Sequence, residues 1–243
     1  MKIFATADLH GQHGRIESLK AAAKEADLIL ICGDVGGYPS PRTDTPSGMS
    51  AIEYKLSQYR SIQKRDAFYL ESILDTIPIP ACYILGNDDW FEIGSKRHLM
   101  SSLQIEDITI IPFEWVQSTP FNTNREANEN KLMYELIKLG NIPEKSIILA
   151  HTPPKGIGDR LPNNTHVGSI SVRDWIACHQ PAVWLCGHIH ESFGTSHIGR
   201  TLVANCTTGY FDKSALRGYI IDTDTMLATE RIYRNLDREE GDH

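Results

Sequence analysis

The stretch "LILICGD", residues 28–34, decides the fold because a continuous apolar run ends there at a glycine and a carboxylate. An unbroken apolar run, without the alternation of a half-exposed strand, is typical of a strand that is buried on both faces. Such strands occur in α/β proteins, in which helices cover the sheets. Ligands of these folds bind beyond the carboxyl ends of the strands, where Gly33 and Asp34 stand.

Apolar runs of the same kind alternate with helical segments along the rest of the chain. A helix is predicted around Ile16 and Leu19, and a longer one from about residue 51 to residue 75, where "IPIP" ends it. Further strands are predicted over residues 2–6, 81–85 and 108–111 and within "SIILAH" and "AVWLCGHIH", and further helices over residues 125–139 and 172–179. Glycine-separated β-branched runs over residues 192–233 are typical of antiparallel strands. We predict an α/β fold in one domain over residues 1–243, with a flexible tail over 236–243.

Composition and charge indicate an ordinary globular protein and exclude several classes of function. The chain has 243 residues, of which 41% are apolar, and its five cysteines include Cys32, Cys82 and Cys186 within apolar runs. Buried cysteines of that kind are typical of reduced, intracellular proteins. The net charge of −7 and the lack of a basic cluster make nucleic acid an unfavourable partner. No apolar run approaches the ~20 residues that span a bilayer, so we predict a cytoplasmic protein with no membrane partner and leave the oligomeric state open.

Side chains that can bind metal stand at the ends of five predicted strands. They are Asp8, His10, Asp34, Asn87 with its neighbours Asp88 and Asp89, His151, His188 and His190. Imidazole, carboxylate and amide oxygen together suit Mn, Fe, Zn or Co. The donors exceed what one ion uses, so we predict two divalent transition-metal ions with one bridging carboxylate. Ordinary hydrogen-bonding roles are expected for the other histidines, which are His13, His98, His166, His179 and His197.

The ordered blocks "DLH", "GD", "GND", "H" and "GHIH" resemble the calcineurin-like metallophosphoesterases over nearly the whole chain. The stretches "HTPPKGIGD", "LCGHIHESFG" and "ANCTT" resemble more particularly the branch related to class III cyclic nucleotide phosphodiesterases. The resemblance implies a four-layer α/β sandwich, in which two central mixed β-sheets are flanked by helices. It places the metal site at the carboxyl ends of the strands.

The resemblance also implies a role for each residue of this set. The first metal would be held by Asp8, His10, Asp34 and His190, and the second by Asp34, Asn87, His151 and His188. A hydroxide that bridges the metals would attack the phosphorus of a small-molecule phosphate ester, such as a phosphodiester, an activated monoester or a nucleotide. The predicted catalytic residues are Asp88, Asn87 and His188, and the amide NH2 of Asn87 is expected to stay free to donate.

Two positions depart from the family pattern. Gly37 replaces an Asp or Asn that often follows the bridging carboxylate, and Asp88 replaces a histidine that contacts phosphate and protonates the leaving group. Burial and Asp89 would raise the pKa of Asp88, whereas two cations would lower it, so the sign stays open. We expect a selective hydrolase of diesters or of esters with good leaving groups. The alternative is a weakly active or non-catalytic nucleotide-binding, phosphate-binding or scaffold protein that keeps the fold and the metals.

A third alternative is a protein phosphatase or a nuclease, of which the acidic composition disfavours the nuclease. Loops at the carboxyl ends of strands carry specificity. We therefore expect the loop over residues 152–168, with Lys155, Asp159 and Arg160, to form a wall of the substrate pocket. Simple solvation of Lys155 and Arg160 is an equal alternative.

Overall fold

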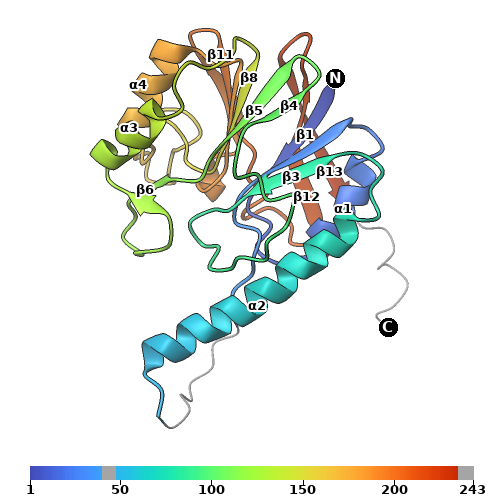
Figure 1. Ribbon diagram of the computed structural model, residues 1–243, viewed down its shortest axis with the longest axis vertical. Helices are drawn as coiled ribbons and strands as arrows, with labels where there is room; N and C mark the ends of the chain where they lie inside the picture. The colour runs from blue at the N-terminus through green and yellow to red at the C-terminus, as the bar shows by residue number, and fades with distance from the viewer. Residues whose placement is uncertain (40–47, 235–243) are drawn as a thin grey trace.

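The computed structural model describes residues 1–39 and 48–234, and within them two mixed sheets face each other (Figure 1). The first sheet has five strands, in the order β13 (Leu227–Arg234), β12 (Ala215–Asp222), β1 (Lys2–Thr6), β2 (Leu28–Cys32) and β3 (Ala81–Ile84). Strands β1, β2 and β3 are parallel, and β12 pairs antiparallel with both β1 and β13.

The second sheet has six strands, most of which are also parallel. Their order is β10 (Gly194–Ile198), β11 (Thr201–Asn205), β9 (Val183–Cys186), β8 (Ser146–Ala150), β5 (Ile108–Phe113) and β4 (Leu103–Ile105). The four inner strands are parallel, whereas β10 and β4 add antiparallel edges. A short parallel pair, β6 (Val116–Gln117) and β7 (Glu126–Ala127), lies apart from both sheets.

Helices cover the outer face of each sheet, which gives four layers. Figure 1 shows α1 (His13–Ala22) and α2 (Ala51–Leu74) on one side, and α3 (Glu129–Ile137) and α4 (Ile170–His179) on the opposite side. Ile16 and Leu70 pack with Ile29 under the first pair, and Leu132 packs with Trp184 under the second. A third apolar cluster fills the space between the sheets. The predicted four-layer α/β sandwich is confirmed.

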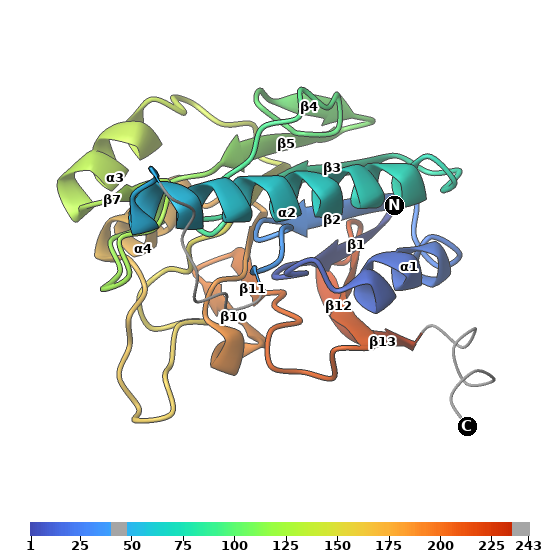
Figure 2. The ribbon, with the colours of Figure 1, turned by 90° about the horizontal axis from the view of Figure 1, so that it is seen from below.

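Helix α2 is the longest element, and only its second half is buried. A capping box between Ser50 and Glu53 begins the helix. Its first turns expose Ile52 and extend past the sheet, whereas Ala67, Leu70 and Leu74 pack on the first sheet (Figures 1 and 2). No helix in residues 1–39 and 48–234 has both the length and the apolar character that a bilayer crossing requires.

Some predicted boundaries were wrong. The helix expected from residue 125 begins only at Glu129, because Asn128 caps it by accepting a hydrogen bond from the Lys131 amide. Arg125 has a left-handed backbone, and Glu126 and Ala127 form β7. The antiparallel strands expected over residues 192–233 are present as the pairs β10–β11 and β12–β13, but β11 also pairs parallel with β9. The tail over 236–243 lies outside the described residues, and the single domain over 1–243 stays a prediction.

Candidate metal centre

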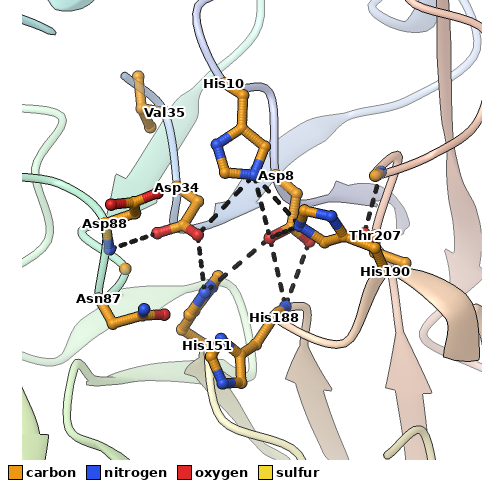
Figure 3. A network of polar contacts seen from close by, with 12 residues as sticks. Asp8, His10, Asp34, Val35, Asn87, Asp88, His151, His188, His190 and Thr207 are labelled. Atoms are coloured by element: carbon orange, nitrogen blue, oxygen red, sulfur yellow. Dashed lines mark hydrogen bonds and ion pairs between the residues drawn. The ribbon is translucent and has the colours of Figure 1, made fainter. Parts of the chain in front are cut away.

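The carboxyl ends of β1, β2 and β8 bring most of the predicted metal ligands into one buried cluster (Figure 3). Ligand atoms within 4.8 Å of one another form three overlapping sets in the described residues. The sets are Asp8 with His10 and His190, Asp8 with Asp34 and His151, and His10 with Asp34 and Asp88. Asp8 and Asp34 each belong to two sets, so each carboxylate can be shared between two cations.

Imidazole nitrogens and carboxylate oxygens converge on the centre of this cluster. The Nε2 atoms of His10 and His190 lie 3.1 Å apart, and Nε2 of His190 lies 3.3 Å from Oδ1 of Asp8. Nε2 of His151 lies 3.3 Å from Oδ2 of Asp34. Burial alone would raise the pKa of Asp8 and Asp34, but the neighbouring histidines hold the pKa of both carboxyls below its usual value. The carboxylates are therefore ionised and available to a cation.

His151 has a fixed orientation that suits a metal ligand. Its Nδ1 donates a hydrogen bond to the Cys32 carbonyl, at 2.6 Å, which leaves Nε2 facing the carboxylates. Within the described ranges, this Nε2 atom is buried and accepts or donates no hydrogen bond. Burial lowers the pKa of His151, but Asp34 and Asp8 raise it to about 10. A proton thus occupies the position in which a divalent cation would satisfy the same carboxylates.

Asn87 presents its amide oxygen to the cluster. Its Nδ2 donates to Oγ1 of Thr123, at 2.7 Å, and that hydroxyl is in turn bound to Glu126. Thr123 uses one of the two N–H bonds of the NH2 group, which leaves the second one to donate elsewhere, and Oδ1 is buried without a partner among the described residues. A buried unpaired oxygen costs about 1–3 kcal/mol, so a metal ion is a fitting partner for it.

His188 lies at the edge of the cluster and in none of the three sets. Its backbone N–H donates to the carboxylate of Asp8, at 3.2 Å to Oδ2, and its ring packs edge-on against His151, 5.2 Å away. Figure 3 shows the His188 ring on the far side of His151 from His10. Burial, followed by His151, lowers the pKa of His188 to about 4. The imidazole is neutral and can serve as a ligand.

The backbone around the cluster is strained, which is typical of functional sites. Left-handed φ angles occur at Asp8 (61°), His10 (47°), Asp34 (53°) and His188 (70°). The glycines that precede two of the ligands are also required, because a Cβ atom on Gly187 would lie 2.6 Å from the Asp8 carboxylate and one on Gly86 would collide with Asp34. The backbone at these two glycines thus lies too close to the carboxylates for any larger residue.

Asp88 and Asp89 follow Asn87 but differ in their surroundings. Asp88 is half-buried, and its amide donates to Oδ1 of Asp34, at 2.9 Å. Burial and then Asp34 raise the pKa of Asp88, while a hydrogen bond with Tyr38 lowers it. Asp89 is fully buried and accepts hydrogen bonds from the amides of Val35, Gly36 and Gly86. Asp89 therefore holds two ligand-bearing loops together and does not face the cluster.

Two residues of α2 that we did not predict also position these loops. Gln63 donates to the Asp88 carbonyl and accepts from the Trp90 amide. Asp66 accepts from the amide of Gly37, at 3.0 Å. Asp66 thus fixes the backbone of the loop that follows Asp34. Both residues are polar positions on the buried, apolar face of α2, and that is the signal in the sequence that could have revealed them.

A pocket of about 460 Å³ opens over the cluster. Its lining residues are Asp34, Tyr38, Lys55, Tyr59, Asn87, Asp88, Phe121, Thr123, His188, His190 and Tyr210. The loop over residues 152–168 does not contribute to it, so that prediction was wrong. Asp159 instead binds the amides of Gly156 and Gly168, and Arg160 binds Asn164, which keeps the loop folded on itself.

The other five histidines lie outside the cluster. His98 contacts Glu114, His166 contacts Asp159, and His179 lies 3.0 Å from the Trp175 carbonyl. His13 stacks on Tyr69. His197 is exposed on β10.

Comparisons with known proteins agree with the fold. A family model described as calcineurin-like phosphoesterase matches residues 1–192. Protein MJ1162 of Methanocaldococcus jannaschii is 29% identical over 215 residues, which are 84% of this chain and 87% of that protein. The TT1561 structure of Thermus thermophilus has a TM-score of 0.60 at 16% identity, over 95% of this chain and 97% of its own. A dimetal phosphatase of Danio rerio has a TM-score of 0.58 at 8% identity, over 96% and 98%.

Proposed function

Because the chain belongs to the calcineurin-like phosphoesterase family, we propose that it hydrolyses small phosphate esters with two divalent transition-metal ions, drawn from Mn, Fe, Zn and Co. The observation that carries the proposal is that Asp34 belongs to two of the three ligand sets. Ions in such a pair clamp phosphate oxygens and lower the pKa of water toward 7. The family resemblance assigns Asp8, His10, Asp34 and His190 to one ion, and Asp34, Asn87, His151 and His188 to the other.

The residues of this chain hold the ligands and shape the choice of ester. The Cys32 carbonyl fixes the His151 ring, and Thr123 turns the Asn87 oxygen toward the cluster. Asp88 faces the pocket where a cationic histidine would attract phosphate and protonate the leaving group. Phosphodiesters and monoesters with good leaving groups, nucleotides among them, need that proton least. The phosphodiesterase-like branch supports the same choice.

The test combines metal content with turnover. The purified protein is analysed for bound metal and assayed with a nitrophenyl phosphodiester, alongside Asp34→Asn and the exposed control His197→Ala. We expect about two ions per wild-type chain, and a loss of at least about a hundredfold in rate for Asp34→Asn, because the shared ligand is weakened. His197→Ala should match the wild type. Turnover that survives full removal of metal would contradict the proposal.

The second candidate is a protein that binds phosphate or nucleotide without hydrolysing it. The observation that favours it is the carboxyl of Asp88, whose pKa burial and Asp34 raise toward the protonated form and which carries no positive charge. Bound metal and bound phosphate without turnover of any ester would support this candidate.

A further inference from the structure

Four aromatic side chains are among the residues that line the pocket over the cluster. Tyr38, Tyr59, Phe121 and Tyr210 line it, and we call them the aromatic rim. Three of them are strongly exposed, with exposed fractions of 53% for Tyr38, 80% for Phe121 and 78% for Tyr210. Single exposed rings are common on proteins, but several gathered over one cavity mark a binding surface.

The rim is assembled from segments that are far apart in the sequence. Tyr38 follows β2, Tyr59 belongs to α2, Phe121 lies between β6 and β7, and Tyr210 follows β11. This convergence does not follow from local sequence, because each segment supplies one ring. The pocket therefore has aromatic walls above a polar floor.

The rim is packed directly against the candidate ligands. Tyr38 stacks on His10 with ring centres 5.0 Å apart, and Tyr210 meets His190 edge-on at 5.1 Å. Tyr59 in turn meets Tyr38 edge-on. A phosphate held by the cluster would place the group attached to it within reach of these rings.

The charges of the residues that line the pocket indicate which kind of group is attached to the phosphate. Among the described lining residues, Lys55 is the only lysine or arginine, and Asp34 and Asp88 are acidic. A chain of further phosphates would therefore meet too little positive charge. A flat, uncharged ring instead matches the aromatic faces, since base-on-aromatic stacking tolerates many rings.

We propose that the aromatic rim binds the group that stays on the phosphate, and that it selects esters in which this retained group is planar and aromatic, either a nucleobase or an aryl ring. Phe121 and Tyr210 act as specificity-determining residues, because they are the most exposed rings of the rim. This inference rests on the proposed hydrolysis and names the class of ester that the site takes.

The test uses three diesters with the same leaving group, which are the nitrophenyl esters of methyl phosphate, phenyl phosphate and thymidine monophosphate. The bond that breaks joins phosphorus to the nitrophenyl oxygen in all three esters. The ratio of kcat/KM between two esters, compared between the wild type and each variant, therefore measures how the rim interacts with the group that stays on the phosphate. We expect the phenyl and thymidine esters to exceed the methyl ester by about tenfold or more. In Phe121→Leu and Tyr210→Leu, and most in the double variant, the ratio of kcat/KM for the phenyl or thymidine ester to that for the methyl ester should fall several-fold.

Matched controls come from exposed rings elsewhere. Phe68 on α2 is 60% exposed and Tyr134 on α3 is 59% exposed, and neither lines the pocket. Phe68→Leu and Tyr134→Leu should leave every ratio unchanged. An excess for thymidine alone would narrow the ring to a nucleobase and still support the rim. No excess in the wild type, or an excess that survives in the double variant, would overturn the inference.

Failure of the rim and failure of the hydrolase are separable. Hydrolysis of all three esters without preference would refute selection by the aromatic rim but not the proposed hydrolase activity. If no ester is hydrolysed, the hydrolase proposal fails, and the metal-loaded protein is titrated by calorimetry with thymidine monophosphate and with methyl phosphate. The rim then predicts at least about fivefold tighter binding of thymidine monophosphate, lost in the double variant. Equal affinities would refute it.

Discussion

Asp88 is the residue at which this site differs most from the family pattern, because it replaces a histidine. It faces the pocket beside Asp34 and shares a hydrogen bond with the Tyr38 hydroxyl. Burial raises the pKa of that hydroxyl, followed by the negative charge of Asp88, so the tyrosine stays protonated and donates. The pair of Asp88 and Tyr38 holds one proton at the pocket but presents no positive charge to a phosphate group bound there.

Replacing Asp88 with histidine tests the proposed choice of ester. Asp88→His should raise turnover of diesters with poor leaving groups about 10²-fold relative to those with good ones, because an imidazolium can protonate the departing oxygen. The measurement is the ratio of kcat/KM for an alkyl and a nitrophenyl leaving group. Asp88→Asn is the control, since it removes the charge without adding an acid. An unchanged ratio in Asp88→His would contradict the role given to this position.

His151 makes metal binding depend on pH. Burial lowers its pKa, but Asp34 and Asp8 raise it to about 10 without metal, so the ring is protonated at neutral pH and must lose that proton to bind an ion. Apparent affinity for Mn²⁺ should therefore rise by up to about tenfold for each pH unit, over the range below about pH 10. Calorimetry in two buffers of different ionisation enthalpy measures the protons released. Binding without release, at constant affinity across pH, would show that the ring is already neutral.

At the scale of elements, α2 links the substrate pocket to the loops that bear ligands. Its exposed first half supplies Lys55 and Tyr59 to the pocket, and its buried second half supplies Gln63 and Asp66 to the loops after β3 and β2. One helix thus positions both walls of the site. Changes on its buried polar positions should act on metal binding without touching the pocket.

Truncating Asp66 tests this linkage. Asp66→Ala leaves the Gly37 amide without its acceptor and should lower the free energy of unfolding by about 1–3 kcal/mol. Metal affinity should fall as well, because Gly37 follows Asp34 in the same loop. Asp66→Asn keeps an acceptor and should lose less, and Lys64→Ala, at an exposed position on the same helix, should stay within about 0.5 kcal/mol. Equal unfolding free energies for all three variants would contradict the claim that α2 positions the loop at Gly37.

The elements also show what the sequence could and could not predict. The strand ends at Asp34 and His151 could be predicted from the sequence. Buried parallel strands have continuous apolar runs, and polar residues follow only where the strand reaches the edge of the sheet. The contact of Gln63 and Asp66 with loops 25 to 29 residues away depends on how α2 packs, which no local pattern records. The Thr123 hydroxyl that turns the Asn87 amide is likewise set by a loop fold. The loop at Lys155 was misassigned because Asp159 folds it inward.

At the scale of the whole molecule, the cluster joins the two sheets. Asp8 and Asp34 follow strands of the first sheet, and His151 and His188 follow strands of the second. A cation between them would add a cross-link between segments that are otherwise held by apolar packing and by a few hydrogen bonds, such as that from His151 to the Cys32 carbonyl. Metal loading should then change the stability of the whole fold rather than one loop.

Metal removal measures that cross-link. Ions present at a hundred times their dissociation constant add about 2.7 kcal/mol per site, so chelation of both ions should lower Tm by roughly 10–20 °C for a chain of this length. Thermal unfolding is followed with and without chelator, and with metal restored. Asp34→Asn should show a smaller shift. Identical melting curves for loaded and stripped wild type would mean that the ions do not bridge the sheets.

The residues of the cluster that have a left-handed backbone create a trade-off between thermal stability and activity. Asp8, His10, Asp34 and His188 each hold a backbone conformation that glycine would adopt with less strain. Glycine at any of them would relieve about 1 kcal/mol or more of that strain. Directed evolution for heat resistance alone would thus favour the loss of these side chains. A thermostable variant of this protein must be selected with turnover in the same screen.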